Sequence, residues 1–307
     1  MKRREFIRQL GLGLAAGCAL GRGAWPLSAW AGSPEVRLAL LADAHLKGGD
    51  PNRPEALLLA RAVAEIRALT PAPDLVLFAG DLAHRGRPHA LDLGKEILSD
   101  LPAPLLAVMG EGDALDGTST PWTRRFGDGR FSFSHRGVHL LGLPTALQRR
   151  ASAGPAFQVG EEPRRWLARE LAKLDPVTPL VILSHAPLAH TYQPWQQWTV
   201  DAPEIAALLA PFQSVLCLHG HVHQAGVRDQ GPGVSKGNNF RDLFLTENRK
   251  QKTENRLSLP ATAWPLPSPL EGTPSAPRPG QGPRGCGWTL LTLRDHTFNY
   301  QPHTWLA

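Results

Sequence analysis

Cysteine, long hydrophobic runs and a strong net charge are all scarce in this chain of 307 residues. The apolar stretch at residues 10–20 is too short to span a bilayer comfortably, so we expect no stable membrane span after processing. The formal net charge is +6, but residues 1–31 carry +4 of it and leave only +2 for the rest. A protein so close to neutrality has no global attraction for nucleic acid, and we expect no nucleic-acid partner.

The three cysteines are Cys18, Cys217 and Cys286. Cys217 lies in the apolar run 215–218, where a buried thiol behaves as a small hydrophobic group. A disulfide between Cys217 and Cys286 would be permitted in an oxidising compartment. Nothing in the sequence requires that pairing, so a disulfide and two free thiols remain alternatives.

Residues 1–31 have the three parts of a secretory signal: a basic start, a short apolar run and the ending Ser28-Ala29-Trp30-Ala31. The core Arg3-Arg4-x-Phe6-Ile7 resembles the twin-arginine export signal, which implies that the twin-arginine export machinery carries the folded chain to the periplasm or another exported location. An amphipathic helix start is the alternative, but the glycines at 11, 13 and 17 weaken a helix. Cys18 leaves open a lipid-anchored or membrane-tethered form.

Short apolar runs alternate with helical patterns in the first part of the remaining chain. Strands are predicted at residues 36–42, 75–79 and 105–109, and helices at 54–69 and 91–98. This order is typical of parallel strands joined by crossover helices.

The second part of the chain is predicted to contain a hairpin, two helices and several strands. The hairpin strands are at 130–134 and 138–143, the helices at 166–174 and 203–209, and the other strands at 180–183, 215–218, 257–261, 288–293 and 297–300. Residues 264–285 are rich in proline and glycine and predict an irregular surface loop. Because we find no internal repeat and no clean linker, we expect residues 32–307 to form one domain.

Nearly every predicted strand is followed by an acid or a histidine. The strand ends read Asp43-Ala44-His45, Gly80-Asp81, Gly110-Glu111-Gly112-Asp113, Ser184-His185 and Gly220-His221-Val222-His223. Functional groups collect at the carboxyl ends of strands in open α/β sheets. Each residue alone is more readily a helix cap or a loop residue, but together these imidazoles and carboxylates would be expensive to desolvate without cations. We therefore expect a metal site where the strand ends meet.

The order of these motifs resembles the signature of the calcineurin-like metallophosphoesterases: Asp-x-His, Gly-Asp, a Gly-Asn-His-Asp-like loop, His and Gly-His-x-His. The pattern covers residues 36–224 of this chain. The resemblance implies an α/β fold, a four-layer α/β/β/α sandwich that holds two metal ions. It also implies a small phosphoester substrate, for which we favour a phosphodiester or a nucleotide-like compound.

The resemblance also implies which residues bind the metals. Asp43, His45 and His223 would bind the first metal, His185 and His221 would bind the second, and Asp81 would bridge both. Carboxylate and imidazole ligands suit Fe, Mn or Zn, as two divalent or mixed-valence ions. Such a pair lowers the pKa of a bridging water, so the nucleophile would be metal-bound hydroxide, and no serine or cysteine is required.

One loop departs from the family signature, because Gly110-Glu111-Gly112-Asp113 stands where Gly-Asn-His-Asp is usual. Glu111 is an oxygen donor and is predicted to be a metal ligand, but its charge makes the site less positive. A trivalent ion such as Fe(III), a less charged diester substrate and poor turnover are the three consequences we consider. Gly112 replaces an imidazole that usually contacts the substrate, and loss of a general acid typically lowers the rate about 10²–10⁴-fold.

His84 and Arg85 follow Asp81 closely and are the candidates for the missing catalytic groups. His84 would replace the general acid, although a solvated loop histidine is the alternative, and Arg85 would hold a phosphate oxygen. Two functions remain: an exported phosphohydrolase, or a metal-binding protein that has lost hydrolysis through the change at Glu111 and Gly112. A third hypothesis, a nucleic-acid-binding module, is supported only by the basic residues between 236 and 256. A solvated loop would account for these basic residues as well.

Overall fold

The computed structural model describes residues 35–114, 118–150, 154–188, 199–221, 285–294 and 297–306. The chain divides into two units, Met1–Ser33 and Pro34–Ala307, and every described residue belongs to the second. The predicted signal, His223, the predicted strand at 257–261 and the predicted loop up to residue 284 lie outside the described residues.

A five-stranded sheet has the strand order β11-β10-β1-β2-β3. Its parallel part consists of β1 (Val36–Leu41), β2 (Leu75–Ala79) and β3 (Leu105–Val108), joined by the helices α2 (Pro54–Arg67) and α3 (Pro88–Leu98). The last two strands, β10 (Gly285–Arg294) and β11 (Thr297–Leu306), pair antiparallel to each other, and β10 pairs antiparallel to β1. The predicted strand–helix–strand order is therefore confirmed.

A four-stranded sheet has the order β4-β5-β8-β9. The strands β4 (Phe131–His135) and β5 (Val138–Gly142) form the predicted hairpin, and β8 (Leu180–Leu183) and β9 (Val215–Leu218) continue in parallel to β5. The helices α5 (Glu161–Leu171) and α6 (Ala202–Leu209) precede β8 and β9 respectively. A separate two-stranded sheet consists of β6 (Ala146–Arg150) and β7 (Gly154–Gln158).

Alternating apolar residues on the strands build three hydrophobic cores. Val36, Leu38 and Leu40 of β1 face the space between the two large sheets, where they meet residues of β5, β8 and β9. Ala39 and Leu41 face α2 and α3 on the other side. The third core packs α5 and α6 against the outer face of the four-stranded sheet.

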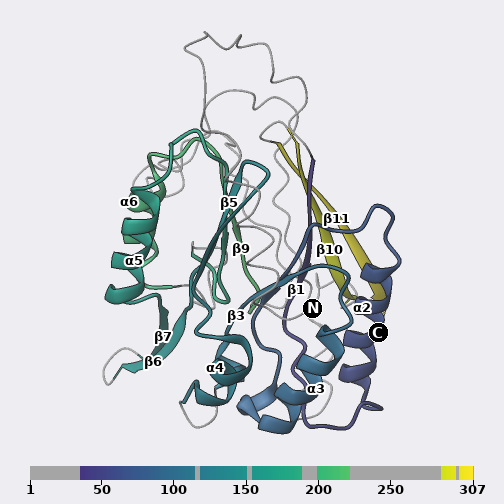
Figure 1. Cartoon of the computed structure of the whole chain (residues 1–307). Coiled ribbons are helices and arrows are strands. Elements are labelled where there is room, and N and C mark those ends of the chain that lie inside the picture. Colours follow the sequence, from purple (N-terminus) through teal and green to yellow (C-terminus); the bar gives the residue numbers. More distant parts are fainter. Residues whose placement is uncertain are drawn as a thin grey trace, which may run out of the picture. The chain divides into compact units, whose positions relative to one another are not determined.

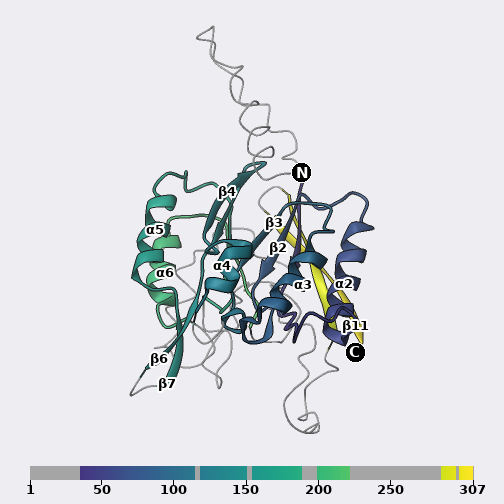
Figure 2. The same cartoon turned by 60° about the horizontal axis from the view of Figure 1, so that its bottom comes forward.

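The three cores separate four layers of secondary structure. In Figure 1, α5 and α6 lie on one side of the two sheets and α2 and α3 on the other. Figure 2 shows the same separation from a second direction. The predicted four-layer α/β/β/α sandwich is therefore confirmed.

Several elements differ from the prediction. The helix α5 begins at Glu161 instead of residue 166, because Glu161 and Glu162 occupy its first turn, where acidic side chains favour a helix start. Gly285, predicted to end a loop, begins β10. The short helices α4 (Thr120–Phe126), η1 (His84–Gly86) and η2 (Glu111–Asp113) were not predicted, nor were β6 and β7.

Two further findings concern the cysteines and the membrane. Cys217 is a free thiol and forms no disulfide. Among the described residues, no helix combines the length and the hydrophobicity that a membrane crossing requires.

Candidate metal centre

Five predicted ligands lie at the ends of strands from both large sheets. Asp43, Asp81 and Glu111 follow β1, β2 and β3, while His185 and His221 follow β8 and β9. Parallel strands bring their carboxyl ends to the same edge of a sheet, so these residues meet. The ligand atoms form two overlapping groups in which all atoms lie within 4.8 Å of one another: Glu111, His185 and His221, and Asp43, Asp81 and His185.

His45 lies beside the second of these groups. Its Nε2 is 3.6 Å from Oδ2 of Asp81. The structure therefore brings together six of the seven predicted metal ligands, and His223 is outside the described residues.

The backbone is left-handed at several of these residues. The φ angles are 56° at Asp43, 48° at His45, 57° at Asp81 and 68° at His221. Such values are uncommon outside glycine and concentrate at functional sites, where the surrounding structure maintains the strain. Here the loops after β1 and β2 hold each other, because the N–H groups of Asp43 and His45 donate to the carbonyls of Gly80 and Asp81, both at 2.9 Å.

His185 is completely buried, and its two ring nitrogens have different environments. Nδ1 donates to the carbonyl of Ala79 at 2.7 Å, so Nε2 is the ring nitrogen that faces the cluster. Nε2 lies 2.6 Å from Oε2 of Glu111 in an ion-pair contact, and neither of these buried atoms has a further hydrogen-bond partner among the described residues. Both atoms point into the cluster, so a metal cation bound there would contact an imidazole nitrogen and a carboxylate oxygen together.

His221 is held on three sides. Its backbone N–H donates to both carboxylate oxygens of Asp43, at 3.1 and 3.2 Å, and Nδ1 lies 2.9 Å from Oε1 of Glu111. The ring of Phe157 packs edge-on against the imidazole, with centroids 4.4 Å apart. Nε2 of His221 is buried and has no hydrogen-bond partner among the described residues. Phe157 lies in the unpredicted strand β7, and nothing in the sequence around it indicated this contact.

The acidic side chains of the cluster have pKa values that are shifted in different directions. Burial raises the pKa of Asp43 to about 7 and raises that of Asp81 well above its ordinary range. Burial also opposes ionisation of Glu111, but the imidazoles of His185 and His221 outweigh it and hold the pKa of Glu111 well below its usual range. The raised pKa values of Asp43 and Asp81 show that the imidazoles do not compensate all three carboxylates, and a divalent cation would supply the missing positive charge. The cluster's carboxylate and imidazole donors fit such an ion.

Three glycines let the loops approach the cluster closely. A Cβ atom at Gly220 would lie 2.7 Å from Oδ2 of Asp43, and one at Gly80 would lie 2.7 Å from both the Gly110 nitrogen and Nδ1 of His185. A Cβ atom at Gly110 would collide with the carboxylate of Asp81. Glycine at these positions is therefore a steric requirement of the site.

The predicted catalytic residues His84 and Arg85 lie in η1, which packs against η2 and hence against the Glu111 loop. His84 is half-buried and its N–H donates to the carbonyl of Leu46 at 2.9 Å. Arg85 is exposed and has a φ of 56°. The third predicted catalytic residue, Asp81, lies in the cluster itself.

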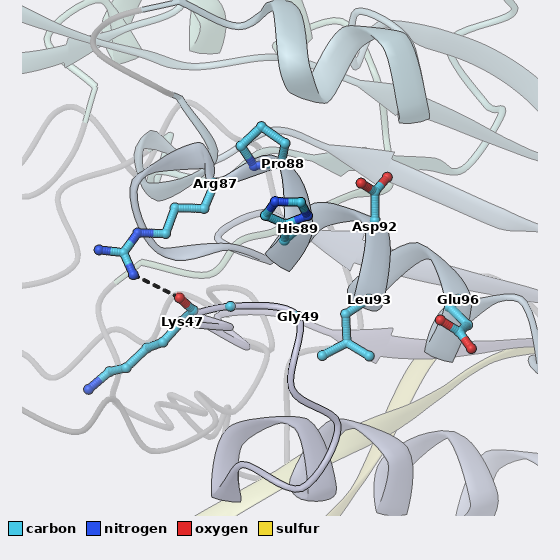
Figure 3. Close-up of a pocket in the computed structure, with 9 residues that line it drawn as sticks. Lys47, Gly49, Arg87, Pro88, His89, Asp92, Leu93 and Glu96 are labelled. Atoms are coloured by element: carbon cyan, nitrogen blue, oxygen red, sulfur yellow. Dashed lines mark hydrogen bonds between the residues drawn. The ribbon is translucent and has the colours of Figure 1, made fainter.

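A separate pocket lies between the loop after His45 and the start of α3 (Figure 3). Arg87 donates to the carbonyl of Lys47 at 2.9 Å across it, and Asp92 on its wall is ion-paired to Arg125. Its lining consists of Lys47, Gly48, Gly49, Arg87, Pro88, His89, Asp92, Leu93 and Glu96. None of these nine residues is a predicted metal ligand, so the candidate site is the cluster and not this pocket.

Two curated proteins are similar to the chain in sequence. A probable glycerophosphodiester phosphodiesterase GpdQ from Arcobacter nitrofigilis is 25% identical over 174 residues, or 54% of this chain. A probable cyclic nucleotide phosphodiesterase from Synechococcus sp. is 26% identical over 162 residues, or 52% of this chain. In both cases the match spans 62% of the relative's own length.

Two solved structures share the fold. A purple acid phosphatase from yellow lupin superposes with a TM-score of 0.55 at 14% identity, covering 89% of this chain and 53% of the other. A dimetal phosphatase from Danio rerio gives a TM-score of 0.53 at 15% identity, covering 88% of this chain and 99% of the other. Residues 36–225, well over half of the chain, match the calcineurin-like phosphoesterases. The chain belongs to the calcineurin-like phosphoesterase family.

Proposed function

We propose that this protein is an exported phosphodiesterase that uses two metal ions. The observation that carries the proposal is the convergence of the strand-end ligands into two overlapping groups, in each of which all ligand atoms lie within 4.8 Å of one another. A buried polar atom without a partner costs about 1–3 kcal/mol. Nε2 of His221 in this cluster is such an atom among the described residues, and a bound cation would give it a partner.

The ligands divide between two metal positions. Asp43, His45 and His223 would hold the first ion, and Asp81 would hold both. His185 belongs with the second ion, together with His221 and Glu111, because its Nε2 faces Glu111 while Nδ1 is hydrogen-bonded to Ala79. Bound ions of this kind, such as Fe, Mn or Zn, lower the pKa of water and stabilise charge on a phosphoryl group.

The charge of the site supports a phosphodiester as the substrate. Asp43, Asp81 and Glu111 place three carboxylates around two cations, so the site is less positive than one with a neutral amide at residue 111. A weaker positive field disfavours a dianionic monoester more than a monoanionic diester. Both relatives in sequence are named as probable phosphodiesterases, which agrees with this choice.

Residues near the cluster are assigned the roles that the metal ligands do not fill. His84 in η1 is proposed to protonate the leaving group, and exposed Arg85 to contact a phosphate oxygen. Gly112 contributes no side chain, but its N–H donates to Oδ1 of Asp81 at 2.7 Å and holds that carboxylate in the cluster.

The proposal is tested by Asp81→Asn, assayed with an activated phosphodiester in the presence of Mn²⁺ or Fe²⁺. We expect the wild type to hydrolyse the diester and the variant to lose that activity, because the bridging carboxylate is gone. Asp100→Asn, an exposed change in the turn after α3, serves as the control and should keep full activity. A wild type that binds two metals per chain but hydrolyses no ester would instead identify a metal-binding protein that has lost hydrolysis.

The exported location is proposed from Arg3 and Arg4 and is tested separately. We expect replacement of both by lysine to leave the precursor in the cytoplasm, whereas the wild type is recovered outside it. Equal export of both forms would contradict a twin-arginine signal.

A further inference from the structure

Asp113 is a fully buried carboxylate with hydrogen-bond donors on both of its oxygens. Its Oδ2 accepts the backbone N–H of Asp81 at 2.9 Å and that of Gly110 at 3.0 Å. Its Oδ1 accepts the N–H of Ala83 at 2.8 Å. One side chain therefore binds three backbone groups from the loops after β2 and β3.

These bonds surround two proposed metal ligands. Asp81 and Ala83 flank Leu82, so Asp113 fixes the segment in which Asp81 adopts its left-handed conformation. Glu111 lies between Gly110 and Asp113, and the bond from the Gly110 N–H to Asp113 closes the turn that presents it. The loops are also tied in the other direction, by the Gly112 N–H on Asp81.

We infer that Asp113 is a positioning residue that holds Asp81 and Glu111 in place at once and thereby couples the two metal positions. The inference rests on the proposed function, since it concerns ligands of the proposed ions. Asp113 itself belongs to neither group of ligand atoms, and its two oxygens are already used by N–H donors. Groups that orient metal ligands typically change metal affinity or activity 10–100-fold when they are replaced.

The decisive variant is Asp113→Asn, which has the same shape but offers one acceptor oxygen instead of two. Its NH₂ group would face a backbone N–H, so at least one of the three bonds is lost and the two loops shift. We expect the dissociation constants for Mn²⁺, measured by calorimetry and by electron paramagnetic resonance, to rise at least tenfold at both positions. Glu111→Gln should weaken mainly the second position, where Glu111 is the ligand.

A control at the opposite end of the five-stranded sheet separates positioning from stability. Asp74, which precedes β2 at the end opposite the cluster, accepts the Arg37 N–H at 2.8 Å and is ion-paired with Arg136. Asp74→Asn should lower the unfolding temperature of the metal-free protein without weakening Mn²⁺ binding. If Asp113→Asn does not fold, Asp113→Glu, which keeps the charge but displaces it by one methylene, should fold and show the weaker binding.

Each outcome decides the inference. Unchanged Mn²⁺ affinity in a folded Asp113 variant would overturn it, as would failure of both Asp113 variants to fold, because the role would then be in stability alone. A wild type that binds no Mn²⁺ would overturn the proposed function as well, so the two failures are distinguishable.

Discussion

Glu111 is the residue in which the site departs most from a common metallophosphoesterase loop. Its carboxylate reaches both imidazoles of the second ligand group, at 2.6 Å from His185 and 2.9 Å from His221. The side chain is about one quarter exposed, so solvent only partly screens its charge. The charge at residue 111 should therefore influence which phosphoester the site accepts.

We predict that Glu111→Gln shifts the preference from diesters toward monoesters. Two unit charges about 5 Å apart interact by roughly 3 kcal/mol at an effective dielectric constant of about 20, and partial exposure reduces this value. We therefore expect the ratio of kcat/KM for a monoester to that for a diester to rise about tenfold, measured with matched aryl esters and saturating Mn²⁺.

Glu204→Gln, an exposed change on α6, is the control for this measurement and should leave the ratio unchanged. An unchanged ratio in Glu111→Gln as well would show that the charge at this position does not select the substrate.

The surroundings of Gly112 explain why this residue cannot simply be replaced by the histidine that is usual in the family. A Cβ atom at this position would lie 3.0 Å from Oδ1 of Asp81 and 3.1 Å from Oδ2. Any side chain, including the histidine that is usual in the family, therefore requires the Asp81 carboxylate to move. Restoring an imidazole here would disturb the residue that is proposed to bridge the metals.

At the scale of single residues, the sequence predicted which side chains meet but not how they are held. Asp43, Asp81 and Glu111 could be predicted because each follows an apolar strand, and parallel strands end at a common edge. The support from Asp113 depends on hydrogen bonds between loops 30 residues apart, for which no local pattern exists. The same holds for Phe157, whose strand carries no apolar alternation.

The helix α2 is tied to the C-terminal hairpin of β10 and β11 through Glu65. Its Oε2 accepts the indole N–H of Trp288 at 3.0 Å. Its Oε1 accepts the indole N–H of Trp305 at 2.8 Å and the Nε–H of Arg61 at 3.1 Å. The guanidinium of Arg61 also lies over the Trp305 ring, 4.3 Å from its centroid. This network joins residues more than 220 positions apart in the chain.

We predict that Glu65→Gln destabilises the fold by about 1–2 kcal/mol, because an amide cannot accept on both ends. Burial by itself raises the pKa of Glu65, but the donors Trp288, Arg61 and Trp305 outweigh it and leave the pKa below its ordinary value. The carboxylate therefore stabilises the fold above the pKa of the unfolded chain, and this contribution is lost as the pH falls through the folded value.

The measurement is urea unfolding of both proteins across pH. The difference in free energy of unfolding should be largest near neutral pH and shrink below about pH 4. Glu96→Gln on α3, which is exposed, should show no comparable difference. A difference that is independent of pH would mean that packing, and not the charge of Glu65, is responsible.

Among the elements, those with a strong apolar period were predicted and the short or polar ones were not. The helix α4 has only seven residues, and only Trp122 is buried. The strands β6 and β7 read Ala-Leu-Gln-Arg-Arg and Gly-Pro-Ala-Phe-Gln, without the alternation that indicates a half-buried strand. β11 extends to Leu306 although residues 301–306 are polar in part, because pairing with β10 continues from Arg294 to Gly285.

On the scale of the whole sandwich, the candidate site joins the two large sheets. Asp43, Asp81 and Glu111 come from the five-stranded sheet, and His185 and His221 from the four-stranded sheet. Hydrogen bonds already cross between the sheets here, from His185 to Ala79 and from His221 to Asp43. Ions bound at this place would add further links between the layers.

We predict that metal removal lowers the stability of the whole fold. Ligands that bind only the folded state stabilise it by about 2.7 kcal/mol at a concentration 100 times the dissociation constant. Without ions, the buried carboxylates also lack compensation. Chelation should therefore lower the unfolding temperature, and added Mn²⁺ should restore it, as followed by scanning calorimetry.

The Asp81→Asn protein is the control, and its unfolding temperature should respond much less to chelator or Mn²⁺. Identical unfolding of the wild type with and without metal would contradict a cation that links the sheets.

The absent side chains at Gly80, Gly110 and Gly220 have a consequence for how such a site tolerates change over time. These residues donate no ligand atom, yet the next atom outward from each backbone would occupy space held by a carboxylate, an imidazole or a neighbouring strand. We therefore expect substitutions to be tolerated at the surface of this protein but not at these three glycines, which are as constrained as the proposed metal ligands. The lack of a side chain at these glycines leaves the space that the proposed ligands occupy.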